Sequence, residues 1–135
     1  MDENEIAKTI VDSAFKVHTT LGPGLLESVY EVTLAYEIST RGLTVERQIP
    51  IPILYGPIRI EEGYRADILV NGLVLIEVKS VESLQSVHSK QLLTYLRLTN
   101  KKLGLLINFN ENLIKNGIKR IVNGLPEKTS LNNLK

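Results

Sequence analysis

Two acids and a lysine, Asp67, Glu77 and Lys79, are the residues of this chain whose types and spacing best suit chemistry. They lie in two short, otherwise apolar runs that flank Asn71-Gly72, which is the sequence form of a β-hairpin. Side chains alternate between the two faces of a strand. The even-numbered positions here are all apolar or aromatic: Tyr64, Ala66, Ile68, Val70, Val74, Ile76 and Val78. The odd-numbered positions hold both acids and the lysine, so one strand register places all three on a common face.

The length of the hairpin loop decides whether the two acids meet. A two-residue Asn71-Gly72 turn would put Asp67 and Glu77 on opposite faces, because a slip of one residue inverts every side chain. If the even-numbered side chains form one buried face, the loop has an odd length. We therefore predict a three-residue loop with a glycine bulge. In that register the carboxylates lie directly or diagonally across from one another, within about 5–8 Å at Cβ.

Two carboxylates at this separation can share one divalent cation. Hard oxygen ligands suit Mg²⁺ or Mn²⁺, which bind carboxylates and phosphate oxygens while keeping several waters. Such an ion polarises a phosphate and lowers the pKa of a bound water. Lys79 could orient that water or neutralise charge that builds up on the phosphate. The alternative is a solvated strand face with a cross-strand ion pair, which Leu73 and Leu75 on the same face disfavour.

Two helices are expected before the hairpin. Apolar residues at helical spacing predict an amphipathic helix over residues 4–20, which a Gly-Pro-Gly segment ends. A second helix is expected over residues 25–40, with Glu27, Tyr30 and Glu31 on one side of it. Glu27 either stabilises the first turn through the helix dipole or supplies a third carboxylate that points toward the hairpin. For Glu31 the two interpretations stay open.

The segments around the hairpin predict a mixed α/β fold. They are an edge strand at residues 43–53 marked by Pro50 and Pro52, a helix from an N-cap at Ser83 to about residue 98, a central strand at residues 103–109, and a short strand at residues 118–121. We therefore predict an α/β domain with a mixed central β-sheet flanked by helices. Its order is ααβββαβ plus a short terminal strand.

The helix after the hairpin carries His88, Gln91 and Tyr95 along one stripe. Read alone, these are polar residues on a helix surface. For His88 the alternative is a proton shuttle or a phosphate contact.

Several motifs, in order along the chain, resemble those of a known family. Asp67, then nine residues, then Glu77-Val78-Lys79 resembles the D…(D/E)xK signature of the PD-(D/E)XK nuclease superfamily. Further matches are Tyr64-Arg65-Ala66-Asp67, Gln91-Leu92-Leu93-Thr94-Tyr95 and Leu103-Gly104-Leu105-Leu106-Ile107-Asn108-Phe109. The segment from Gly24 to Tyr30 matches the motif that names the GxxExxY family, a prokaryotic group similar to that superfamily. The resemblance covers residues 5–122.

The resemblance implies a restriction-endonuclease-like fold and metal-dependent hydrolysis of phosphodiester bonds in nucleic acid, with DNA as the expected partner. It implies that Asp67 and Glu77 bind Mg²⁺ or Mn²⁺, with Glu27 as an auxiliary acid and the Val78 carbonyl as a further ligand. Lys79 would stabilise charge in the transition state. The Gln91-Tyr95 pair resembles a substrate-orienting motif, which implies that the amide and the phenol hold Lys79 and a phosphate by hydrogen bonds. The alternative is a catalytically silent nuclease-fold module for binding or assembly. A third interpretation is hydrolysis of a phosphodiester outside nucleic acids.

Composition indicates one domain. With 135 residues the chain can bury a single core, and we expect that domain over residues 1–125 and a frayed polar tail over 126–135. No apolar run approaches the roughly 20 residues that span a bilayer, so no membrane partner is expected. The start of the chain is acidic rather than basic, and the chain has no cysteine. These features predict a cytoplasmic protein without disulfides.

Charge is distributed unevenly, although the net charge is only +1. Residues 1–83 hold 7 basic and 13 acidic side chains, a net charge of −6, whereas residues 84–135 hold 9 and 2, a net charge of +7. This asymmetry permits a basic face if the fold gathers those residues. A near-neutral monomer argues against tight nonspecific binding to duplexes. It leaves room for a homodimer or a protein partner to supply contacts.

Overall fold

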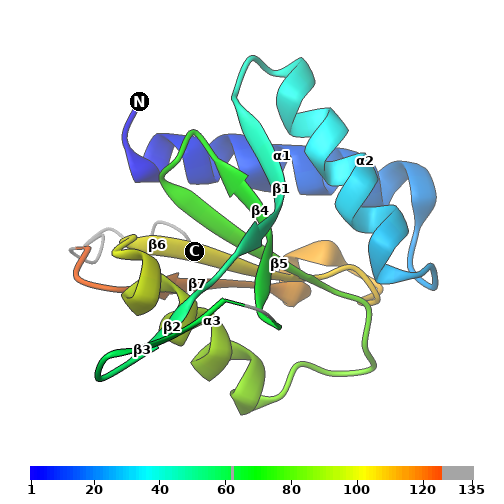
Figure 1. Cartoon of the computed structure of the whole chain (residues 1–135). Helices are drawn as coiled ribbons and strands as arrows, with labels where there is room; N and C mark the ends of the chain where they lie inside the picture. The colour runs from blue at the N-terminus through cyan, green and yellow to red at the C-terminus, as the bar shows by residue number, and fades with distance from the viewer. Residues whose placement is uncertain (62, 126–135) are drawn as a thin grey trace.

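The centre of this computed structural model, which describes residues 1–61 and 63–125, is a five-stranded mixed sheet in the order β1-β4-β5-β6-β7. Helices α1 and α2 cover one face and α3 covers the other (Figure 1). The elements are α1 (Glu3–Leu21), α2 (Glu27–Thr40), β1 (Val45–Pro50), β2 (Ile53–Tyr55), β3 (Ile58–Ile60), β4 (Arg65–Val70), β5 (Val74–Lys79), α3 (Ser86–Thr99), β6 (Leu103–Asn108), a 3-10 turn (Ile114–Gly117) and β7 (Ile118–Val122). The predicted restriction-endonuclease-like α/β fold is confirmed.

The first two helices form where the sequence predicts them. Asp2 caps α1, since its carboxylate accepts a hydrogen bond from the Glu5 amide at 2.9 Å while the Glu5 carboxylate accepts from the Asp2 amide. Ile6 and Ile10 are fully buried on its inner face, and each such side chain contributes about 1.5–3 kcal/mol. The helix ends at Gly22, whose φ of +72° suits glycine.

The β4–β5 hairpin has the predicted register. Val70 pairs with Val74 and Ile68 pairs with Ile76, so three residues form the loop. Within it, Asn71 and Gly72 have positive φ. The Leu73 amide donates to the Val70 carbonyl at 2.9 Å, and the ladder resumes one residue later, which makes Leu73 the extra residue. The odd-length loop is therefore confirmed, and the same register brings the two acids opposite each other.

The predicted single buried face is wrong at its beginning. The even-numbered residues from Ile68 to Val78 pack against α1 and α2, but Ala66 packs on the opposite face with the residues of α3. Tyr64 is half exposed and contacts Tyr95 on that same side. The alternation of side chains thus reverses at Asp67. Regular β4–β5 pairing extends from the turn only as far as Ile68, the residue that follows Asp67 in the chain.

The strand predicted over residues 43–53 is divided in two. Strand β1 is the predicted edge strand and ends at Pro50, and the Ile51 amide still donates to the Tyr64 carbonyl at 2.9 Å. Proline is tolerated there because the missing amide can face the free edge of the sheet. Beyond it, β2 and β3 form a separate two-stranded sheet that projects from the body of the molecule (Figure 1). The predicted order lacked this small sheet.

The predictions for the second half hold except at one helix end. Every residue of β6 is buried between neighbouring strands and the helices, as predicted for a central strand, and β7 follows as the short terminal strand. Helix α3 begins later than predicted, and its N-cap is Gln85 rather than Ser83. The single domain over residues 1–125 stays a prediction, and the predicted tail at 126–135 lies outside the described residues. No helix in the described ranges has the length and apolarity to cross a membrane.

Candidate active site

Asp67 and Glu77 face each other where the β4–β5 ladder stops. The Glu77 Oε2 atom accepts a hydrogen bond from the Asp67 amide at 3.0 Å, and the Asp67 Oδ2 atom accepts one from the Val78 amide at 2.7 Å. Two backbone amides that would otherwise pair with carbonyls therefore hold the carboxylates in place. Within residues 1–61 and 63–125, no hydrogen bond reaches the second oxygens, Asp67 Oδ1 and Glu77 Oε1.

Burial makes both acids hard to ionise. Glu77 is only 5% exposed and Asp67 is half-buried. Desolvation raises the pKa of Asp67 to about 6. For Glu77, desolvation followed by the charge of Asp67 raises the pKa to about 8. At pH 7 the pair therefore retains about one proton. A bound cation would replace that proton and restore the second charge, so this donor set fits a divalent metal ion.

Lys79 ends strand β5 beside the acid pair. Its positive charge lowers the pKa of both Asp67 and Glu77, which places the amine near them. None of the ion pairs in the described part of the chain includes it. Its backbone carbonyl accepts a hydrogen bond from the Phe109 amide at 2.9 Å. The sheet thus fixes the lysine backbone while the side chain keeps its ammonium group for another partner.

Asn108 fixes the segment that follows Lys79. Its side chain is fully buried. The Oδ1 atom accepts a hydrogen bond from the Val81 backbone amide at 3.0 Å, and the Nδ2 atom donates one to the Val81 carbonyl at 2.9 Å. The sequence interpretation included Asn108 in a family motif but assigned it no role. An isolated amide in an apolar strand is a signal that could have identified it, because buried polar groups need partners.

Glu27 lies near the acid pair but does not complete a metal-binding group. It is exposed at the start of α2, and its Oε2 atom accepts a hydrogen bond from the Ser80 amide at 3.3 Å. Its charge contributes to the raised pKa of both Asp67 and Glu77. Among the residues described, no three His, Cys, Asp or Glu side chains are grouped closely enough to hold a metal ion. The Val78 backbone amide donates a hydrogen bond to Asp67, and the predicted role of the Val78 carbonyl as a metal ligand stays a prediction.

Tyr30 positions the loop that carries Glu27. Its hydroxyl donates to the Gly22 carbonyl at 2.6 Å and accepts from the Leu25 amide at 3.1 Å. Its buried ring stacks on Phe109 with centroids 4.7 Å apart. The same loop also contacts the residue that follows Lys79, since the Ser80 hydroxyl donates to the Leu25 carbonyl at 2.6 Å. The tyrosine of the Gly24–Tyr30 motif therefore has a structural role.

Helix α3 brings Tyr95 toward the acid pair. The side chain is 5% exposed, and its ring meets Tyr64 edge-on at 6.4 Å. Burial, and then the charge of Glu77, raises the pKa of Tyr95 to about 12, so the phenol is a donor at neutral pH. Gln91 lies one turn earlier and is partly buried. His88 instead caps the helix, because its Nδ1 atom accepts from the Gln85 amide at 2.9 Å.

Glu31, whose role the sequence left open, is a buried ion-pair partner. It is 7% exposed and accepts hydrogen bonds from Arg47 Nε at 3.1 Å and from Gln48 Nε2 at 3.0 Å. Its charge contributes to the raised pKa of Asp67. The side chain is therefore close to the acid pair, although basic and amide partners already satisfy it.

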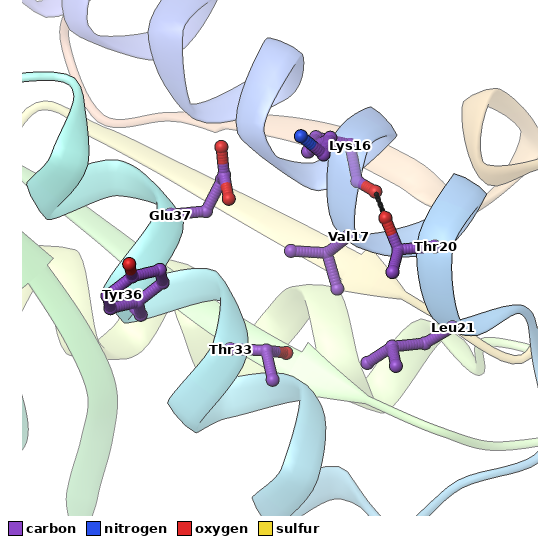
Figure 2. A pocket seen from close by; sticks show the side chains of 7 residues that line it. All are labelled: Lys16, Val17, Thr20, Leu21, Thr33, Tyr36 and Glu37. Atoms are coloured by element: carbon purple, nitrogen blue, oxygen red, sulfur yellow. Dashed lines mark hydrogen bonds between the residues drawn. The ribbon is translucent and has the colours of Figure 1, made fainter.

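A concave surface lies between α1 and α2, lined by neither acid of the pair (Figure 2). Val17, Leu21 and Tyr36 line much of it, and its carboxylate, Glu37, already binds Arg41 at 3.3 Å. This groove contains no pair of acids. The acid pair beside Lys79 is thus the better candidate for chemistry.

Comparison with known families agrees with this geometry. The family model described as the PD-(D/E)XK nuclease superfamily matches residues 4–121. Neither the curated proteins nor the solved structures gave a significant match. Membership of the narrower GxxExxY group stays a prediction. Because the match covers most of the chain, the protein belongs to the PD-(D/E)XK nuclease superfamily.

Proposed function

We propose that the protein is a metal-dependent nuclease that hydrolyses phosphodiester bonds, with DNA as its substrate. The single observation that carries this proposal is the pairing of Asp67 and Glu77, held by backbone amides beside Lys79. Superfamily membership supports nuclease-type chemistry on nucleic acid. The ion is inferred from the two carboxylates, and the substrate and the residue roles are inferred from superfamily membership.

The two acids would hold Mg²⁺ or Mn²⁺ through the oxygens that the backbone does not use, Asp67 Oδ1 and Glu77 Oε1. The Val78 carbonyl is proposed as a further ligand. When bound, the ion supplies charge stabilisation and an acidified water. Glu27, held by the Ser80 amide, adds negative charge as an auxiliary acid.

The neighbouring side chains would act on the phosphate and the water. Lys79 follows Glu77 by two residues on β5, and its charge lowers the pKa of both carboxylates. It is proposed to orient the attacking water or to neutralise charge that develops on the phosphate oxygens. The Tyr95 phenol keeps its proton at neutral pH and can donate it in a hydrogen bond to a phosphate oxygen. Gln91, one turn earlier on α3, is proposed to orient the same group.

A catalytically silent binding or assembly module is the second candidate. It is favoured by the position of Glu27, which forms no three-acid group with Asp67 and Glu77 in the described ranges. A homodimer or a protein partner would then supply contacts with nucleic acid. Sedimentation with and without DNA tests that assembly.

Cleavage assays with Mg²⁺ or Mn²⁺ on linear DNA, branched DNA and RNA test the nuclease proposal. We expect cleavage that Asp67→Asn and Lys79→Ala strongly reduce. Glu46→Gln, a control at an exposed acid on β1, should leave it unchanged. Metal titration by calorimetry should show binding that Asp67→Asn removes. Cleavage that survives Lys79→Ala would indicate a contaminant or another site. Absence of both cleavage and metal binding would favour the silent module.

A further inference from the structure

Four residues beside the acid pair have no part in the proposed chemistry: Glu31 on α2, Arg47 and Gln48 on β1, and Arg65 on β4. We refer to them as the Gln48 cluster. Gln48 has a φ of +55°, a left-handed conformation that is uncommon for a residue other than glycine. Such a backbone costs of order 1–3 kcal/mol and persists only where the surroundings hold it. The contacts of Gln48 show what holds it.

The unusual backbone lets two consecutive side chains reach one carboxylate. In a regular strand, Arg47 and Gln48 would point to opposite faces of the sheet. Here Arg47 Nε donates to Glu31 Oε2 at 3.1 Å, while Gln48 Nε2 lies 3.0 Å from both Glu31 oxygens. The Glu31 side chain is only 9% exposed. A buried carboxylate thus fixes both residues.

A second arginine is attached to the same residue. Arg65 Nη1 donates to the Gln48 carbonyl at 3.3 Å. Each arginine is therefore held through one nitrogen, and within the described ranges their other guanidinium nitrogens have no protein partner. The Arg47 side chain is 44% exposed, and Arg65 is also exposed. Two oriented guanidinium groups thus present free donors to solvent.

The cluster adjoins the acid pair. Ladder pairs Arg47↔Ile68 and Ile49↔Ala66 leave Gln48 level with Asp67, and adjacent strands are about 4.8 Å apart. A polyanion that approaches Asp67 and Glu77 meets repulsion from these acids and from Glu27. Nearby positive charge offsets that repulsion. A simple structural ion pair explains the contact between Arg47 and Glu31, but not the left-handed Gln48 or the attachment of Arg65.

We propose that Arg47 and Arg65 bind phosphate oxygens of a nucleic-acid strand next to the bond at Asp67 and Glu77, and that Glu31 and Gln48 are positioning residues for them. The proposal rests on the proposed nuclease function and names the part of the site that holds the substrate. Guanidinium groups suit this task, because their planar donors match phosphate oxygens. Attachment through one nitrogen limits the rotamer freedom that each arginine would lose on binding.

Binding of duplex DNA in EDTA, measured by fluorescence anisotropy over a salt series, separates this inference from cleavage. We expect the double variant Arg47→Ala/Arg65→Ala to bind at least tenfold more weakly. The slope of log K against log salt should fall by about 0.9 for each phosphate that the variant no longer binds. The matched control is Lys8→Ala/Arg41→Ala, which removes two cations from exposed helical ion pairs. Equal affinity of the double variant and the control would overturn the proposal.

Further variants test the positioning role. Gln48→Gly accepts the left-handed backbone but removes the hydrogen bonds to Glu31, so it should weaken binding severalfold. It should add nothing in the Arg47→Ala/Arg65→Ala background, because the effects act through the same groups. An additive loss would argue against positioning. Arg47→Lys keeps the charge but not the planar donor pair. If the alanine variant misfolds, Arg47→Lys replaces it, and it should bind DNA more weakly than the wild type.

The two proposals can fail separately. DNA binding that depends on both arginines, without any cleavage, would support the cluster and reject the nuclease function. Where cleavage occurs, the double variant should raise KM about tenfold and change kcat less than threefold. A fall in kcat with KM unchanged would place the arginines elsewhere in the reaction and overturn the anchoring role.

Discussion

The two ends of the β4–β5 hairpin are built from the same pair of strands but differ in their backbone hydrogen bonding. At the turn end, Val70 and Val74 pair in a regular ladder and are fully buried. At the open end, backbone amides donate to Asp67 and Glu77 instead of to carbonyls. The turn end contributes stability through apolar burial, whereas the open end carries buried acids that resist ionisation. Apolar burial at the turn end therefore offsets the cost of burying the two acids at the open end.

The largest effect is expected on activity at the open end. Asp67→Asn should reduce metal-dependent cleavage about 10³-fold, which corresponds to about 4 kcal/mol in the barrier, because the amide cannot replace an anionic ligand. The fold should survive, since the amide oxygen can still accept from the Val78 amide. Single-turnover kinetics and circular dichroism measure the two outcomes. A variant that cleaves within tenfold of the wild type would remove Asp67 from the site.

The next effect is expected on stability, in the apolar part of the hairpin that packs against the helices. Ile68→Ala removes a fully buried side chain between β4 and helices α1 and α2. We expect a loss of about 2–5 kcal/mol in the free energy of unfolding, measured by urea denaturation. Any activity should persist below the melting temperature. If this variant lost activity while it stayed folded, the two ends would not be separable.

The free energy of unfolding should depend on pH through Glu77. Its pKa is raised from 4.5 to about 8, so between these values the folded state binds more protons than the unfolded state. The contribution of Glu77 to stability is then fully present below about pH 4.5 and is lost as pH rises toward 8, by at most about 1.4 kcal/mol per pH unit. Denaturation in EDTA at pH 5, 6.5 and 8 should show this fall. In Glu77→Gln it should be smaller, and an equal fall would contradict the assignment.

The smallest effect concerns the hairpin loop. Asn71 has a φ of +52°, and its Oδ1 atom accepts a hydrogen bond from the Thr44 amide at 2.8 Å. Asn71→Ala should cost about 1–2 kcal/mol, because alanine tolerates this backbone poorly and lacks the acceptor. Asn71→Gly keeps the backbone and loses only the acceptor, so it should cost less. Thermal unfolding of the two variants separates the contributions, and equal costs would assign the effect to the hydrogen bond alone.

The sequence predicted what depends on neighbouring residues and missed what depends on distant ones. Alternation in the hairpin was enough to predict its three-residue loop and the pairing of Asp67 with Glu77, and motif order was enough to predict the superfamily. The left-handed Gln48 depends on Glu31, 17 positions earlier, and no local pattern encodes that contact. The reversal of side-chain alternation at Asp67 is likewise not encoded in a local pattern. The roles assigned to the site residues stay predictions.

One loop has a consequence for engineering. The Gly-Pro-Gly connection between α1 and α2 has the composition of a segment that accepts inserted residues. In this chain, the Tyr30 hydroxyl binds it at Gly22 and Leu25, and Ser80 binds it from the end of the central strands. A fluorescent tag or a fused peptide placed there would separate the glutamate-bearing helix from the lysine-bearing strand. The outward side of the small β2–β3 sheet is a safer place for such a label.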